Sequence, residues 1–395
     1  MLEVHLGEVD ISPKELDKRA AAREFPYDSG VWLFKELIHE SMPSKCIVSR
    51  REGNTKLYSH KRVSEFAGIR ELYLKHEGEN PTGSFKDRGM TVGVSEAVRL
   101  KAKIVCCAST GNTSASLASY AALAGLKAVV FIPSGEIAYG KLAQSIAYGA
   151  KVVQIKGNFD DSMRLIQEAA AHLNMYILNS VNPWRIEGQK AITFELMQQM
   201  GWDGPDWIAL PAGNLGNTSA MGKAFSELKE LGFIEKIPRI AAIQSEGANP
   251  FYLMWKAGAS ELVRVKHPDT IASAIKIGNP VSWKKALKAM KISNGVVEQV
   301  SDNQILDAKA IIDASGIGCE PASAASLAGV KKLREKGVIK AGQKVVCILT
   351  GNILKDPNTT VSYHTNKLDS IKPSYMNPPV EVDGNLDAIM KALKA

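Results

Sequence analysis

Residues 80–89 read Asn80-Pro81-Thr82-Gly83-Ser84-Phe85-Lys86-Asp87-Arg88-Gly89. This tight polar turn precedes a run that is compatible with a helix, and it presents one lysine at the start of that run. A lysine in such a place is a candidate Schiff-base nucleophile. Because most lysines are solvated, an ordinary lysine in a first helical turn is the competing interpretation of Lys86.

Three further turns rich in glycine and asparagine follow along the chain. The first two lie where a strand-like run gives way to a helical run, and the third lies near the end of the chain. Four such elements in this order make a functional role for Lys86 the stronger interpretation. The three turns are Ser109-Thr110-Gly111-Asn112-Thr113-Ser114, Pro211-Ala212-Gly213-Asn214-Leu215-Gly216-Asn217 and Leu349-Thr350-Gly351-Asn352-Ile353-Leu354-Lys355-Asp356-Pro357.

The composition indicates a globular protein with a large core. The chain has 395 residues, of which 45% are hydrophobic and 23% are charged, and it is long enough for about two domains. No apolar run approaches the length of a membrane span, and the start lacks a signal-peptide pattern, so we expect a cytoplasmic protein with no membrane partner. Five cysteines without a C-x-x-C pair argue against a disulfide framework and a zinc ribbon, and we expect no metal site.

The net charge of +8 could suggest a nucleic-acid partner. The basic residues are instead scattered over amphipathic stretches such as 283–291 and 331–340, which is typical of a solvated face. We therefore expect no nucleic-acid partner. A mild positive bias also suits an anionic cofactor and an anionic substrate.

Short β-rich runs alternate with helical runs from about residue 70 onward. This alternation predicts an α/β fold with mainly parallel sheets covered by helices, arranged as two three-layer αβα domains. We expect a large domain from residues 1–89 plus 182–395, with a tail packed on its surface, and a smaller mobile domain from residues 90–181. The predicted strands are 72–77, 103–108, 127–132, 151–156, 175–180, 207–211, 240–245 and 344–349.

The turns lie at the carboxyl ends of predicted strands, where open α/β sheets bind ligands. The 213–217 turn precedes a helical run from 219 to 231, so its N–H groups can bind a phosphate, although an ordinary glycine turn is the alternative. The 109–114 turn could hold a ring oxygen or a carboxylate, or its side chains could simply cap a helix. Arg185 offers a planar fork suited to phosphate; the alternative is an exposed arginine paired with Glu187.

Taken together, these motifs resemble the threonine synthase family, which belongs to the fold-type II pyridoxal-phosphate enzymes. The resemblance runs from roughly residue 30 to residue 357. It also rests on three motifs not yet quoted: Lys75-His76-Glu77, Asn182-Pro183-Trp184-Arg185-Ile186-Glu187-Gly188-Gln189-Lys190 and Glu320-Pro321-Ala322-Ser323-Ala324-Ala325-Ser326.

The resemblance implies a role for each matching residue. Lys86 would form the Schiff base with pyridoxal 5'-phosphate and carry protons, Asn112 would bond the phenolic oxygen of the cofactor, and Thr350 would face its pyridine nitrogen. The cofactor phosphate would be held by Gly213, Asn214, Leu215, Gly216 and Asn217. The substrate phosphate would be held by Ser84, Asn182 and Arg185, and the substrate carboxylate by Thr110, Gly111, Thr113 and Ser114.

The implied enzyme is a carbon–oxygen lyase, expected as a homodimer, that converts O-phospho-L-homoserine and water to L-threonine and phosphate. Arg51, Lys56 and Ile353 depart from the family pattern, which leaves the fine substrate geometry open. A serine/threonine dehydratase, or a cysteate synthase that uses phosphoserine and sulfite, needs the same cofactor machinery. A catalytically silent relative that binds the cofactor is a further alternative.

Overall fold

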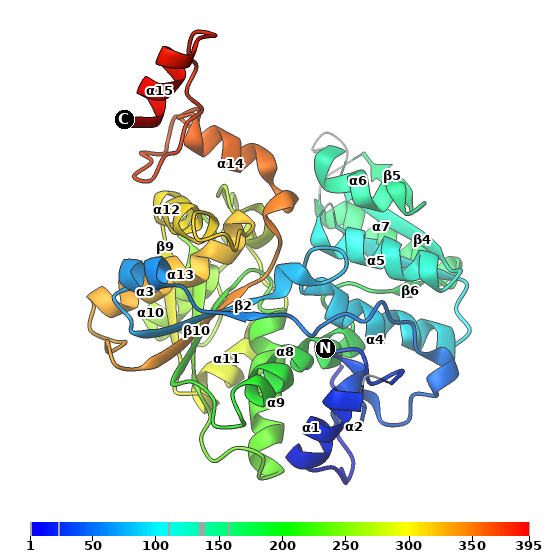
Figure 1. Ribbon diagram of the computed structural model, residues 1–395. Helices are drawn as coiled ribbons and strands as arrows, with labels where there is room; N and C mark the ends of the chain where they lie inside the picture. Colours follow the sequence, from blue (N-terminus) through cyan, green and yellow to red (C-terminus); the bar gives the residue numbers. More distant parts are fainter. Residues whose placement is uncertain (1, 23, 110, 134–138, 157–158, 395) are drawn as a thin grey trace.

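Two β-sheets form the centre of the molecule (Figure 1). The computed structural model describes residues 2–22, 24–109, 111–133, 139–156 and 159–394. In the larger sheet only β1 and β2 pair antiparallel, and the smaller sheet is entirely parallel. The larger sheet has the order β1 (Leu57–Tyr58), β2 (Glu71–His76), β10 (Lys344–Leu349), β7 (Trp207–Pro211), β8 (Arg239–Ser245), β9 (Val296–Val300), and the smaller β5 (Lys151–Ile155), β4 (Lys127–Pro133), β3 (Ile104–Ala108), β6 (Tyr176–Ile177).

The predicted α/β class with mainly parallel sheets is confirmed, and all eight predicted strands are present. The sequence missed β1, which has only two residues, and β9, in which Glu298 and Gln299 interrupt the apolar run. The run predicted over 175–180 is a strand only at Tyr176–Ile177. The division into a large domain and a smaller mobile domain stays a prediction.

Alternating side chains of the larger sheet face two separate cores. Ile208, Ile240 and Val346 belong to one core, whereas their neighbours Trp207, Ala241 and Val345 belong to the other. This alternation follows from the two-residue period of a strand. The first core is covered by α8 (Pro183–Gln199), α9 (Gly216–Glu230), α10 (Pro250–Ala257) and α11 (Trp283–Ile292), and the second by α3 (Lys61–Ala67), α12 (Asp302–Asp313) and α13 (Pro321–Glu335).

The smaller sheet is covered on both faces in the same way. Val105 and Cys107 of β3 face one core, and Cys106 faces the other, so both cysteines are core residues. The first core includes residues of α4 (Lys86–Arg99), α5 (Asn112–Leu123) and α6 (Tyr139–Ala147), and the second includes residues of α7 (Phe159–His172).

The remaining helices lie at the two ends of the chain and in short connections. The amphipathic stretch 331–340 is helical only in its first half, because α13 ends at Glu335 and Gly337 adopts a φ of +71°. No helix within the described ranges is long and apolar enough to cross a lipid bilayer. These elements are α1 (Pro13–Ala22), α2 (Lys35–His39), α14 (Pro357–His364), α15 (Leu386–Lys394) and the 3₁₀ turns η1 (Trp32–Phe34), η2 (Ser44–Cys46), η3 (Glu77–Glu79), η4 (Ser273–Ile275) and η5 (Ile353–Lys355).

The C-terminal tail contacts the body of the protein only over its first part. Tyr375 packs edge-on against Phe66, with ring centroids 5.9 Å apart, and the Ser374 hydroxyl donates to Asp307. Beyond Tyr375 the tail is mostly exposed, and α15 projects from the molecule (Figure 1).

A buried network of two acids and two bases joins β2, α4 and α8. Arg88 donates to both oxygens of Glu77, at 2.6 and 2.7 Å, and to both oxygens of Glu195, at 3.0 Å each. Lys75 also donates to Glu195, and the N–H groups of Asn54 and Thr55 complete the shell of that carboxylate. Burial raises the pKa of Glu195, but Arg88 and Lys75 outweigh it and hold that pKa well below its usual range.

Two glycines allow α4 and α8 to cross closely beside this network. A Cβ on Gly188 would lie 2.0 Å from the carbonyl oxygen of Arg88, and a Cβ on Gly89 would lie 2.8 Å from that of Arg185. Only glycine fits such an approach. The crossing brings the helix that begins at Lys86 against the helix that carries Arg185.

Replacing Arg88 by methionine should lower the free energy of unfolding by about 3–5 kcal/mol, because two buried carboxylates lose their partner. The control is Lys61→Met, since Lys61 is 86% exposed and pairs with Glu65, itself 65% exposed, at the surface; its cost should stay below about 1 kcal/mol. Urea denaturation followed by tryptophan fluorescence measures both. Equal midpoints for the two variants would contradict the role of the network.

Candidate functional site

The turn that carries Lys86 is hydrogen-bonded to the turn that carries Thr350. The Phe85 N–H donates to the Thr350 carbonyl at 3.0 Å, and the Asn352 N–H donates to the Gly83 carbonyl at 2.9 Å. Gly83 has a φ of +82°, which favours glycine. Backbone pairing therefore holds Lys86, at the start of α4, beside the residues that follow β10.

Asp87 fixes the same turn from the other side. Its carboxylate accepts from the Thr82 N–H at 2.7 Å, the Thr82 hydroxyl at 2.6 Å and the Ser116 hydroxyl of α5 at 2.5 Å. Burial raises the pKa of Asp87 to about 6, against the opposing effect of these donors. The residue after Lys86 thus ties the lysine turn to α5.

The Lys86 amine lies in a site that favours its neutral form. The Nζ atom lies 4.1 Å from the ring centroid of Phe85. Burial, and then the positive charge of Arg185, lower the pKa of Lys86 to about 7, although Glu320 opposes them. A neutral amine is the nucleophilic form, so this geometry suits covalent capture of a carbonyl group.

The glycine turn after β7 leads directly into α9. Leu215 adopts a left-handed φ of +64°, and a Cβ on Gly213 would lie 3.1 Å from Ile275 Cα. Neither side-chain polar atom of Asn217 has a hydrogen-bond partner among the described residues, and the same holds for the buried hydroxyls of Thr218 and Ser282. Unpartnered buried groups at a helix N-terminus fit a bound phosphate.

Glu320 links the two residues that were expected to contact the cofactor ring. Asn112 Nδ2 lies 3.2 and 2.9 Å from the two carboxylate oxygens of Glu320, and the Thr350 hydroxyl lies 3.3 Å from one of them. Asn112 begins α5, whereas Thr350 follows β10. The structure therefore brings the two predicted residues together.

Two of the expected substrate-phosphate residues retain free polar atoms. Ser84 Oγ and Arg185 Nε are buried and have no hydrogen-bond partner in the described part of the chain. Arg185 Nη1 donates to the Leu178 carbonyl at 3.0 Å, and burial lowers the pKa of Arg185 to about 10. The alternative of an exposed Arg185 paired with Glu187 is wrong, because Arg185 is buried and Glu187 pairs with Lys190 and Lys223.

The side chain of Asn182 is engaged within the chain. Its Oδ1 accepts from the N–H groups of Trp184 and Arg185, at 3.0 and 3.4 Å, and its Nδ2 donates to the Ile177 carbonyl at 3.0 Å. Asn182 thus caps α8 and fixes the start of the helix that carries Arg185. Its contact with a substrate stays a prediction.

The start of α5 offers the expected carboxylate site. Gly111 is the N-cap and α5 has no side-chain cap; the Ser114 hydroxyl donates back to the Gly111 carbonyl at 2.8 Å, so it does not cap the helix. The first N–H groups of a helix lack helical partners, and this leaves those of Thr113 and Ser114 available to an anion. Thr110 lies outside the described residues.

Two polar residues of the site were not singled out in the sequence. Glu320 was noted only as part of a motif, and Lys355 only as part of the last turn. Lys355 donates to Gln144 of α6, and Gln144 Nε2 donates to the Thr82 carbonyl at 3.3 Å. A signal for Glu320 was present, since it stands directly before Pro321, where a glutamate is a poor helix cap.

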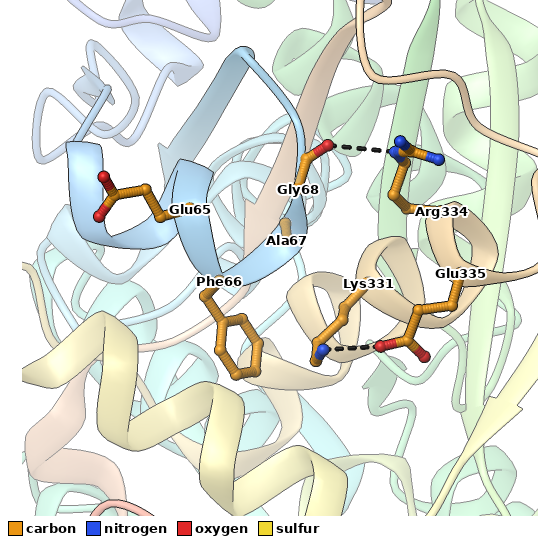
Figure 2. Close-up of a pocket in the computed structure, with 7 residues that line it drawn as sticks. All are labelled: Glu65, Phe66, Ala67, Gly68, Lys331, Arg334 and Glu335. Atoms are coloured by element: carbon orange, nitrogen blue, oxygen red, sulfur yellow. Dashed lines mark hydrogen bonds and ion pairs between the residues drawn. The ribbon is translucent and has the colours of Figure 1, made fainter.

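A surface hollow of about 380 Å³ lies elsewhere, between α3 and α13 (Figure 2). Arg334 Nε donates to the Gly68 carbonyl at 3.1 Å at one side of it, and Lys331 pairs with Glu335 at 2.6 Å at the other. No predicted site residue is among the described residues that line it. The hollow is bordered by surface side chains and lies apart from the Lys86 turn.

Comparisons with known proteins agree on one family and one fold. The family model "Pyridoxal-phosphate dependent enzyme" matches residues 48–351. The chain is 47% identical to threonine synthase of Methanocaldococcus jannaschii (91% of this chain, 88% of that protein) and 46% identical to threonine synthase of Methanosarcina acetivorans (97% and 91%). It resembles the solved structure of maize serine racemase with a TM-score of 0.68 and 21% identity (92% and 99%), a likeness of fold alone.

The rate at which cofactor-free protein captures added pyridoxal phosphate should rise as the pH passes through about 7, because Lys86 then loses its proton. In Arg185→Met the rise should move to higher pH, since the neighbouring positive charge that lowers the lysine pKa is gone. Stopped-flow absorbance measures the rate, and Arg99→Met at the partly exposed Arg99 is the control. A midpoint near the ordinary lysine pKa in the unmodified protein would contradict the assignment.

Proposed function

This chain belongs to the threonine synthase family of pyridoxal-phosphate-dependent enzymes, and from that membership we propose that it converts O-phospho-L-homoserine and water to L-threonine and phosphate around Lys86. The observation that carries the proposal is the lysine of low pKa whose turn is hydrogen-bonded to the Thr350 turn. The unpartnered polar groups at the start of α9 support the same site.

Lys86 is the residue that holds the cofactor and moves protons. Bound pyridoxal phosphate supplies an electron sink that stabilises negative charge at the substrate's α carbon. With a pKa of about 7, the Lys86 amine can both accept and donate a proton near neutral pH, at the α and β carbons of the substrate. Asn112 and Thr350 hold the cofactor ring, and the turn from Gly213 to Asn217 holds its phosphate.

Arg185 assists departure of the substrate phosphate. Its guanidinium is buried, keeps Nε without a partner among the described residues, and acts on the charge of Lys86. A buried cation stabilises the charge that grows on a leaving phosphate more strongly than a solvated one does. The unpartnered Ser84 hydroxyl is a second donor to that phosphate, and Asn182 keeps the α8 start in place.

The carboxylate of the substrate binds at the start of α5. The N–H groups of Thr113 and Ser114 and the positive end of the helix dipole suit a carboxylate. Thr110 and Gly111 belong to the same turn. Binding there brings the α carbon of the substrate close enough to exchange a proton with Lys86.

The smaller part of the protein, residues 90–181, closes over the substrate. The Lys355 to Gln144 hydrogen bond joins the turn after β10 to α6, and Gln144 reaches the lysine turn at the Thr82 carbonyl. Closure keeps bulk water out until it is needed as reactant.

The enzyme acts as a homodimer, which light scattering would reveal as twice the mass of one chain.

Purified holoenzyme should release one threonine per phosphate from O-phosphohomoserine. Lys86→Ala should lose turnover and the visible absorbance of bound cofactor, whereas Lys61→Ala, at an 86% exposed lysine, should keep both. Coupled phosphate and amino-acid assays measure the products.

The same assays separate the alternatives. Cysteate from phosphoserine and sulfite, or 2-oxobutanoate from threonine, at rates above that with phosphohomoserine would reject the proposed reaction. Bound cofactor without any product would favour a silent relative.

Lys355→Met should lower kcat by about tenfold, because it removes a hydrogen bond from a charged group that spans the two parts of the protein. A less closed site should also divert substrate to phosphate, 2-oxobutanoate and ammonia. Product ratios measure this, with Lys331→Met at the surface as control. Unchanged kcat and product ratio would remove Lys355 from closure.

A further inference from the structure

Glu320 sends its side chain into the site instead of capping its own helix. It is the N-cap residue of α13, yet it makes no side-chain cap hydrogen bond, and it is only 5% exposed. Its carboxylate accepts from Asn112 Nδ2, with the shorter distance 2.9 Å, and from the Thr350 hydroxyl at 3.3 Å. A buried carboxylate is costly unless its neighbours compensate it, so this placement calls for an explanation.

The backbone around Glu320 leaves its carboxylate little freedom. A Cβ on Gly351 would lie 2.4 Å from the Glu320 carboxyl carbon and 2.5 Å from Oε1. The Glu320 N–H donates to the Gly351 carbonyl at 3.0 Å. Glycine at 351 therefore makes room for the carboxylate directly beside Thr350.

The groups that surround the Glu320 carboxylate oppose the effect of burial on its pKa. Burial raises the pKa of Glu320, while Asn112, Lys355, Thr350 and Lys86 act in the other direction. Lys86 comes from α4 and Lys355 from η5, so positive charge reaches Glu320 from two elements. The carboxylate is thus supported as an acceptor at the place where the two donors meet.

The carboxylate also determines how its two partners are oriented. An asparagine amide can present either its oxygen or its nitrogen, and a carboxylate selects the nitrogen because it can only accept. The Thr350 hydroxyl is held from a second side, since Ser323 Oγ lies 3.0 Å from it and itself accepts from the Gly351 N–H at 2.9 Å. Asn112 and Thr350 are therefore held in one arrangement across two different elements.

We propose that Glu320 is a positioning residue that holds Asn112 and Thr350 in the orientation that pyridoxal phosphate requires. This inference rests on the cofactor contacts assigned to those two residues under the proposed function. Glu320 acts through its two partners. Its loss therefore changes the affinity for the cofactor and the environment of the bound cofactor. A purely structural glutamate would not alter the cofactor's spectrum.

The test compares Glu320→Gln with Glu298→Gln. Glu298 is a matched control because it is a 4% exposed glutamate that pairs with Lys336 away from the site. We expect Glu320→Gln to weaken pyridoxal phosphate binding by about ten- to hundredfold and to shift the visible absorbance of the holoenzyme, because a carboxamide carries no negative charge and replaces with an NH2 donor the oxygen that Asn112 Nδ2 contacts at 2.9 Å. Glu298→Gln should match the unmodified protein in both readouts.

Two further sets of variants keep the test decisive. Gly351→Ala keeps the carboxylate but crowds it, so it should change binding in the same direction even if Glu320→Gln fails to fold. Asn112→Ala and Thr350→Ala test the cofactor contacts themselves. If these two weaken binding while Glu320→Gln and Gly351→Ala bind and absorb like the unmodified protein, the inference is overturned and the proposed site stands; if none of the four has an effect, the site assignment fails as well.

Discussion

The position of Lys86 depends on the buried charges that meet at Arg88, two residues further along α4. Arg88 shares α4 with Lys86 and lies between Glu77, which begins η3 directly after β2, and Glu195, on α8. β2 lies in the larger sheet, and α4 covers the smaller sheet. Arg88 therefore connects the two sheets at the start of the helix that carries Lys86. A buried ion network contributes stability only when all its members are satisfied, and here two bases meet two acids. The network therefore holds α4 in one position, and this fixes the position of Lys86 as well.

A second constraint is the balance of charge inside the site. Arg185 lowers the pKa of Lys86, whereas Glu320 acts against that effect. The same Glu320 experiences Lys86 and Lys355, and its own pKa is raised by burial. Arg185, Lys355 and, when protonated, Lys86 thus place positive charge around Glu320, which suits a substrate that carries both a phosphate and a carboxylate. Burial increases the strength of each of these interactions.

The sequence predicted the parts of the site that are carried by local turns. The Lys86 turn, the glycine turn before α9 and the start of α5 all follow a strand, and strand and turn signals are local. It did not predict contacts between distant segments, such as Glu320 with Asn112 or Lys355 with Gln144, because a local pattern does not show which distant segment a side chain will meet. The interpretation of Arg185 as exposed failed for the same reason: only the crossing of α4 and α8 buries it. The edge strand β9 was missed because polar residues interrupt its apolar run.

The central claim is that Lys86 is the residue to which the cofactor is attached. Borohydride reduction of the holoenzyme, followed by proteolysis and mass spectrometry of the labelled peptide, tests it directly, since reduction fixes a Schiff base as a stable pyridoxyl-lysine. The account predicts a single modified lysine, Lys86, in the peptide that spans the 80–89 turn. A pyridoxyl group on Lys75, Lys190, Lys355 or any other lysine, with Lys86 unmodified, would contradict it.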